Sequence, residues 1–141
     1  MPEHADIARA IVVNDGEVLI LQNVEDDPSE HARGRWEAPG GFVEAHDDHE
    51  EAAVAREVAE ETGLDVEVVR PLERIAVTLD GDTSDCQYYL ARADSRDVEL
   101  SDEHRAARWI RPGEARDIDW YYYSTYMIPV LERLAAENVL D

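Results

Sequence analysis

The strongest constraint on this chain is the segment from Pro39 to Leu64, which joins a glycine turn to an acidic helix. Its second half begins at Arg56 and reads Arg-Glu-Val-Ala-Glu-Glu-Thr-Gly-Leu. At about 100° per residue, a helix here places Glu57, Glu60 and Glu61 in an arc of about 100°. Glu50 falls in the same arc, and the opposite arc holds Ala52, Ala55, Val58, Ala59 and Thr62. The segment therefore predicts a helix with one carboxylate face and one packing face.

The repulsion between the glutamates on the carboxylate face must be offset by positive charge. Like charges one turn apart destabilise a helix by a few tenths of a kcal/mol per pair, and Arg56 is the only arginine in the segment. Mg²⁺ is a hard cation that takes carboxylate oxygens together with phosphates and water. Because 34 of the 141 residues are acidic, a solvated acidic face would explain the glutamates as well. The order of the parts around them is more specific.

A Pro-Gly-Gly turn, a short Phe-Val-Glu strand, an acidic loop and an Arg-Glu-x-x-Glu-Glu-x-Gly helix follow one another, and Gly63 ends the helix. This order resembles the Nudix box, in which a Gly, five residues, a Glu and seven residues precede Arg-Glu-aliphatic-x-Glu-Glu-x-Gly-aliphatic. The stretch from Arg56 matches every fixed position of the second half. The first half has one extra residue after Gly41, and Asp48 stands eight positions before Arg56 in place of a glutamate. We expect the extra residue within 45–48, and we favour Asp48 as the helix cap over a role in the site.

The resemblance extends to residues 34–41 and 101–110, and it implies a Nudix-type α/β/α sandwich with a mixed β-sheet, as a single domain over 1–141. It also implies bound Mg²⁺, with Mn²⁺ as the alternative, on Glu57, Glu60, Glu61 and the carbonyl of Gly41 or Gly40. Gly40 and Gly41 let the backbone approach substrate phosphates. Arg56 would orient a box glutamate. Some members of the family take the proton from water with a loop acid, for which Glu103 is the candidate here; otherwise the base is Glu61 or Glu57.

The remaining elements follow from local patterns. Residues 7–13 and 18–21 should form a hairpin across Asp15-Gly16. Residues 23–33 read as a loop that borders a pocket or is a plain surface loop. Strands are expected at 66–69, 72–79, 86–93 and 105–110. Tyr88 and Tyr89 should point to opposite faces, where one could stack on a base, although core packing is the favoured role for both. A short helical turn starts at Pro112, and a C-terminal helix over 121–137 should kink or break at Pro129.

The amino-acid composition limits the kinds of molecule that this protein can bind. The formal charge is -21, with 13 arginines and no lysine. This charge disfavours nucleic acid and anionic membranes, and it resembles the composition of proteins from salt-accumulating halophiles. One cysteine, Cys86, excludes an intrachain disulfide and is simplest in a reducing cytoplasm. We expect no membrane-spanning segment and no signal peptide. The partner is a small nucleotide-type molecule, and the oligomeric state is open, with a homodimer as one option.

The expected reaction is hydrolysis of a pyrophosphate bond in a nucleoside diphosphate linked to a group X. No Gly-x-Ser-x-Gly elbow and no Walker motif occur in the sequence, so water is the natural nucleophile. Oxidised nucleoside triphosphates, ADP-ribose and dinucleoside polyphosphates stay open as substrates. A nucleotide-sensing module without catalysis is the alternative from another class. A prenyl diphosphate isomerase would need a cysteine before the box, whereas Cys86 follows it.

Overall fold

One mixed sheet organises the fold. A computed structural model describes residues 6–44, 47, 49–79, 81–121 and 126–137. Within these residues seven strands form a single sheet, accompanied by two α-helices and one 3₁₀ helix. The elements in chain order are β1 (Ile7–Asn14), β2 (Glu17–Asn23), β3 (Trp36–Glu37), β4 (Gly40–Phe42), α1 (Glu50–Thr62), β5 (Val66–Leu79), β6 (Asp82–Ala93), β7 (His104–Ile110), η1 (Pro112–Asp117) and α2 (Met127–Ala136).

The strands run in the order β3-β2-β1-β6-β5, with β4 beside β1 and β7 beside β2. The β1–β6 pair is parallel, and the other pairs are antiparallel. The sheet is therefore mixed, as predicted. The β1–β2 hairpin turns through Asp15 and Gly16, both with positive φ, of 52° and 79°. Positive φ at both central residues matches the right-handed twist of the flanking strands, which is why Asp-Gly predicted this turn correctly.

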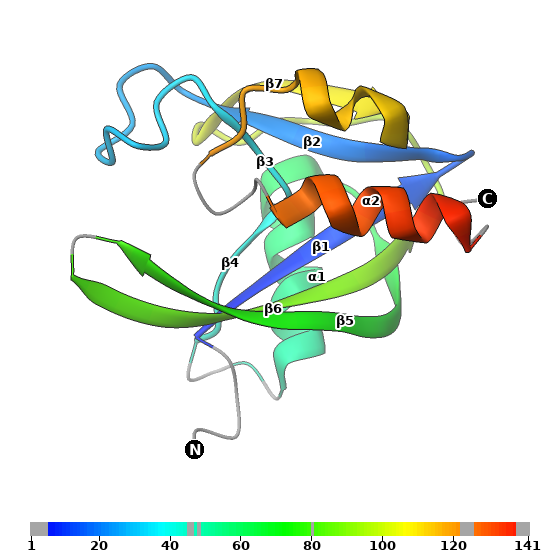
Figure 1. Cartoon of the computed structure of the whole chain (residues 1–141), viewed down its shortest axis with the longest axis horizontal. Coiled ribbons are helices and arrows are strands. Elements are labelled where there is room, and N and C mark those ends of the chain that lie inside the picture. The colour runs from blue at the N-terminus through cyan, green and yellow to red at the C-terminus, as the bar shows by residue number, and fades with distance from the viewer. Residues whose placement is uncertain (1–5, 45–46, 48, 80, 122–125, 138–141) are drawn as a thin grey trace.

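The helices cover opposite faces of the sheet, as expected, and β1 shows how (Figure 1). Alternate residues of a strand point to opposite faces. Ile11 belongs to the cluster that contains Leu131 and Leu134 of α2, whereas Val12 packs in the cluster that contains Val54 of α1. The tyrosines of β6 divide in the same way, because Tyr88 lies in the first cluster and Tyr89 in the second. Both tyrosines are buried core residues.

Two predictions about the outer elements were wrong. The regions 66–69 and 72–79 are one continuous strand, β5, whose pairing with β6 shifts register twice. Helix α2 has no break at Pro129, because this residue is the third of the helix, where a backbone N–H has no partner within the helix and its loss costs little. Residues 122–125 and Asp80 lie outside the described residues. Neither α1 nor α2, the α-helices of the described part, has the length and apolar character needed to span a bilayer.

Candidate active site

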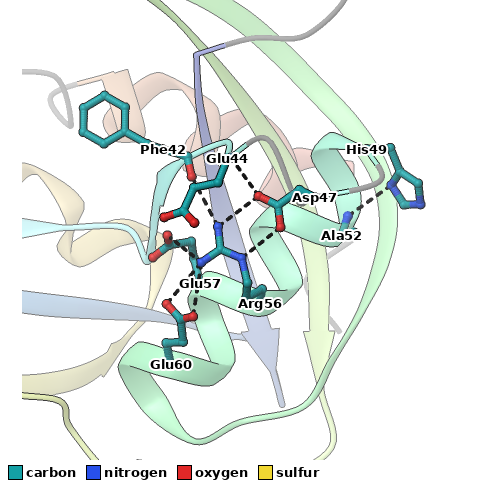
Figure 2. A network of polar contacts seen from close by, with 8 residues as sticks. All are labelled: Phe42, Glu44, Asp47, His49, Ala52, Arg56, Glu57 and Glu60. Carbon is teal, nitrogen blue, oxygen red and sulfur yellow. Dashed lines mark hydrogen bonds and ion pairs between the residues drawn. The ribbon is translucent and has the colours of Figure 1, made fainter.

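Helix α1 begins and ends with clear caps. Its N-cap is His49, whose Nδ1 accepts a hydrogen bond from the N–H of Ala52 at 3.1 Å (Figure 2). We had predicted Asp48 as the cap, but the cap lies one residue later, and Asp48 itself lies outside the described residues. The C-terminal cap is Gly63 with φ of 73°, as predicted. Only glycine adopts this left-handed conformation without strain, and it lets the chain turn sharply into β5.

Arg56 is held in a network of carboxylates in front of α1 (Figure 2). Its Nε and Nη2 donate to the two oxygens of Asp47 at 2.9 and 3.0 Å, and its Nη1 donates to Glu57 at 3.1 Å and to Glu60 at 3.2 Å. The hydrogen bonds to Asp47, followed by those to Glu60, raise the pKa of Arg56. Asp47 stands nine residues before Arg56, whereas the glutamate of the Nudix box stands eight residues before its arginine, a position that Asp48 occupies here. Asp47 is thus a partner of Arg56 that sequence reasoning missed.

The glycine turn fits tightly between β1 and α1. Gly40 has φ of 153°, and a Cβ there would lie 2.3 Å from the carbonyl oxygen of Ala8. A Cβ at Gly41 would lie 2.7 Å from Cδ of Glu57. A side chain at Gly40 would therefore clash with fixed backbone, whereas one at Gly41 would force the Glu57 carboxylate to move, because this carboxylate lies directly against the backbone of Gly41. The N–H of Gly40 donates to Oε1 of Glu61 at 2.8 Å.

The three box glutamates occupy three different environments. Glu61 is 3% exposed, and burial, reinforced by the charges of Glu37 and Glu57, raises its pKa to about 9 despite the hydrogen bond from Gly40. Glu57 is partly buried. Burial raises the pKa of Glu57, Arg56 opposes this shift, and the charges of Glu60 and Glu103 add to it. The side chain of Glu60 is 58% exposed.

The other members of the predicted acidic and packing faces differ in part from expectation. Glu50 is buried away from the cleft, where its carboxylate accepts hydrogen bonds from Arg74 at 2.9 Å and from Tyr89 at 2.8 Å. It therefore fixes the start of α1 to β5 and β6. The packing face of α1 includes Val54 as well as Val58, whereas Ala59 is exposed.

The segment before β7 docks on the C-terminal end of α1. The N–H of Glu99 donates to the carbonyl of Thr62 at 2.8 Å, and the N–H of Ser101 donates to the carbonyl of Glu61 at 3.2 Å. These bonds satisfy carbonyls that the end of a helix leaves without partners. They also bring Glu103 and His104 beside the box helix, although about 40 residues separate them in the sequence.

A buried polar group lies beneath the glutamates, and sequence reasoning did not find it. Nε2 of His104 donates to Oε2 of Glu37 at 3.1 Å, and Nη1 of Arg9 lies 3.6 Å from the same oxygen. Burial alone would raise the pKa of Glu37, but the charge of Arg9 and the hydrogen bond from His104 outweigh it and lower the pKa. Nδ1 of His104 is buried without a hydrogen-bond partner, 3.7 Å from Oε2 of Glu61. The available signals were a charged Arg9 within an apolar strand and the Glu37 and His104 of the two family-like segments.

The carboxylates gathered here could hold a divalent cation. Glu37, Glu61 and His104 each offer a ligand atom, and these atoms lie within 4.8 Å of one another. Glu57 and Glu61 carry raised pKa values because burial and neighbouring carboxylates disfavour their charged forms. A cation near Glu57 and Glu61 would offset that repulsion, whereas Glu37 already faces Arg9. Glu61 belongs both to this buried group and to the predicted set.

These residues line one cavity of about 670 Å³, which we call the acidic cleft. The described lining includes Gly40, Gly41, Arg9, His104 and eight carboxylates, which are Asp26, Asp27, Glu37, Glu44, Glu57, Glu61, Asp102 and Glu103. The 23–33 loop therefore borders a pocket, the first of its two predicted roles. Of the predicted site residues, Glu57, Glu61, Glu103 and the two glycines come together here. Arg56 and Glu60 lie outside the described lining; Arg56 donates to Glu57, and Glu60 accepts from Arg56.

A mixed sheet between helices, with a Glu-rich helix facing a glycine turn, defines the Nudix class of fold. The chain belongs to the NUDIX domain family, whose sequence profile matches residues 4–130. A Mycobacterium tuberculosis protein provisionally named 8-oxo-dGTP diphosphatase 2 is 37% identical over 118 residues, which are 81% of this chain and 78% of that protein. Family and relative together make the protein a Nudix-type pyrophosphohydrolase, an enzyme class that uses divalent metals and acts on small nucleotides.

Solved structures share the fold over nearly the whole chain. The MutT protein from Methanosarcina mazei Go1 superimposes with a TM-score of 0.75 at 25% identity, covering 98% of this chain and 99% of that one. An Ap4A hydrolase from C. elegans superimposes with a TM-score of 0.74 at 23% identity, covering 94% and 98% of the two chains. The second likeness concerns the fold alone.

Proposed function

We propose that the protein hydrolyses a pyrophosphate bond of a nucleoside triphosphate, with oxidised purine nucleotides such as 8-oxo-dGTP as the first candidates. The main support for this reaction is that the carboxylates of Glu57 and Glu61 lie close against the Gly40-Gly41 turn inside the acidic cleft. Such a site repels free polyphosphate, so its substrate must arrive with cations. The name of the Mycobacterium tuberculosis relative supports the choice of substrate. ADP-ribose and dinucleoside polyphosphates are the next to test.

The residues proposed to hold Mg²⁺, or Mn²⁺, are Glu57, Glu60 and Glu61 with the carbonyl of Gly41. Bound metal would neutralise the phosphate charge and lower the pKa of a coordinated water. Glu57 and Glu61 are supported by their place in the cleft, and Glu60 by the sequence motif. Arg56 acts as a positioning residue, because it holds Glu57 and Glu60 with one nitrogen while Asp47 holds its other side.

The proton of the attacking water goes to a carboxylate. Glu103 is the first candidate because it lines the cleft and its charge acts on Glu57. Its loop is anchored to α1 through the backbone of residues 99 and 101, so the carboxylate can be presented from a fixed position. Glu61 and Glu57 are the other candidates within the box helix.

The test is a substrate panel of 8-oxo-dGTP, dGTP, ADP-ribose and diadenosine tetraphosphate with Mg²⁺, at low and at molar KCl. In ¹⁸O water, 8-oxo-dGTP should give 8-oxo-dGMP and pyrophosphate, with one ¹⁸O atom in one product. Glu57→Gln should lose activity, and the matched control Glu67→Gln, on β5 outside the cleft, should keep it. Failure of the wild type to hydrolyse any member of the panel under either salt condition would refute the proposal.

A further inference from the structure

An exposed aromatic ring stands at the edge of the acidic cleft. Phe42 is 66% exposed, and among the described residues the other large hydrophobic side chains with high exposure are Val69 and Leu100, neither of them aromatic. A single exposed apolar residue is ordinary on a protein surface. The position of Phe42 is what needs an explanation, because it lines the acidic cleft and also a second cavity beside it.

The second cavity has about 630 Å³ and a different charge; we call it the arginine pocket. Its described lining includes Arg9, Arg33, Ile7 and Pro28, with one acid, Glu30. The acidic cleft, in contrast, has eight carboxylates. In a chain of charge -21, a pocket with more arginines than acids stands out. Its volume falls in the range of small-molecule sites, which combine apolar walls with a few polar groups.

The two cavities adjoin, because Arg9, Gly41, Phe42 and Tyr121 are among the residues that line both. A bound molecule that reaches across this shared lining can place a charged end in the acidic cleft and an uncharged end in the arginine pocket. Phe42 belongs to the lining that the two cavities share.

The backbone holds this ring in a fixed relation to the box helix. Phe42 pairs with Ile7 of β1, and its carbonyl oxygen accepts a hydrogen bond from Nη2 of Arg56 at 3.4 Å. Gly41, which separates Phe42 from the turn, lies against the Glu57 carboxylate. Figure 2 shows the Phe42 ring directed away from the Arg56 network. The backbone that carries the ring is therefore anchored, one residue from the position where phosphates are expected.

We propose that Phe42 is a stacking surface for the nucleobase of the substrate, and that the base occupies the arginine pocket while the phosphates face Glu57 and Glu61. This proposal rests on the proposed function and specifies where its nucleotide substrate places the base. Every base has a flat π face that stacks on an aromatic ring. Ser29 and Arg33 at the pocket wall offer polar groups to the edge of a base.

The test measures binding separately from hydrolysis. Two probes are each titrated into the protein in the presence of Mg²⁺, and their Kd values are measured by calorimetry. One is a non-hydrolysable α,β-methylene analogue of dGTP, and the other is methylenediphosphonate, which has the phosphonate groups without a nucleoside. Phe42→Leu should weaken the Kd of the analogue about fivefold or more, the lower range of base–aromatic stacking, and leave that of methylenediphosphonate unchanged. Phe42→Trp should restore the analogue to near wild-type affinity. Val69→Ala is the matched control, because Val69 is an exposed apolar residue of β5, and it should change the Kd of neither probe.

Two results would overturn the stacking site: an unchanged analogue Kd in Phe42→Leu, or an equal loss for both probes. Folding is not at risk, because the ring is largely in water, and thermal unfolding of each variant checks this. If the wild type binds the analogue in a Phe42-dependent way but hydrolyses no nucleotide, the proposed reaction fails and the stacking site stands. If it hydrolyses nucleotides and Phe42→Leu binds as well as wild type, the reaction stands and the stacking site fails.

Discussion

Removing the charge of Glu61 should stabilise the metal-free protein in a pH-dependent way. Glu61 is 3% exposed, and burial raises its pKa from the ordinary 4.5 to about 9. Glutamine keeps the shape and can still accept the hydrogen bond that Gly40 now donates to Oε1. Glu61→Gln thus removes a titrating group with little change in packing.

The sign follows from the two protonation states. Below about pH 4.5 the carboxyl is protonated in both the folded and the unfolded chain. Between about pH 4.5 and about pH 9 the unfolded carboxyl is ionised while the folded one keeps its proton, so the free energy of unfolding falls by roughly 1.4 kcal/mol per pH unit. At pH 7 this amounts to about 3 kcal/mol, which the glutamine variant does not lose.

The assay is urea unfolding of both proteins in EDTA between pH 4.5 and pH 8.5, followed by tryptophan fluorescence. The stability difference should be near zero at the lowest pH and grow in favour of Glu61→Gln as the pH rises. With saturating Mg²⁺ the order should reverse, because ligand binding stabilises only the chain that binds it. Glu60→Gln is the control, since that side chain is 58% exposed and mostly solvated. A difference that does not vary with pH would refute the reasoning.

Three further results are expected. Gly41→Ala places a Cβ 2.7 Å from Cδ of Glu57, so the carboxylate must move, and calorimetry should show Mg²⁺ affinity reduced about tenfold or more in a folded protein; unchanged affinity would remove Glu57 from the metal site. Glu103→Gln should lower kcat by about 10² to 10⁴ with little change in KM or Mg²⁺ dependence, and a change below about threefold would place the base within the box helix. Because the charge is -21, the thermal midpoint should rise substantially between about 0.1 M and 3 M KCl; a flat curve would contradict adaptation to salt.

Local signals in the sequence predicted the elements well. The Asp15-Gly16 hairpin and the Gly63 stop of α1 depend on backbone conformations that few residues adopt, and both are observed. Pro129 misled for a related reason. Its effect depends on its position within a helix, and the start of that helix at Met127 could not be read from the spacing of apolar residues.

Two side-chain pairings in the site depend on tertiary contacts and could not be predicted from the sequence. Asp47 and Asp48 are adjacent acids in a loop with one extra residue, and we predicted Asp48 as the cap of α1. The cap is His49, and Asp47 is a partner of Arg56 that the spacing did not indicate. The buried pair of Glu37 and His104 joins β3 to β7 across 67 positions, and no local pattern records such a pairing.

The box glutamates show why helical spacing locates a site without defining its chemistry. Seen along α1, Glu61 stands only about 20° from Val54, so the acidic arc overlaps the packing face instead of opposing it. Glu61 is consequently buried beside Val58, whereas Glu60, one position away, faces water. Burial raises the pKa of Glu61 to about 9. The side chain of Glu57 is less buried than that of Glu61 and more buried than that of Glu60. Because the folded chain keeps a carboxylate at a depth where its charge is unfavourable without a cation, the metal-free fold is less stable than its packing would permit, and a cation bound beside Glu61 would recover that stability.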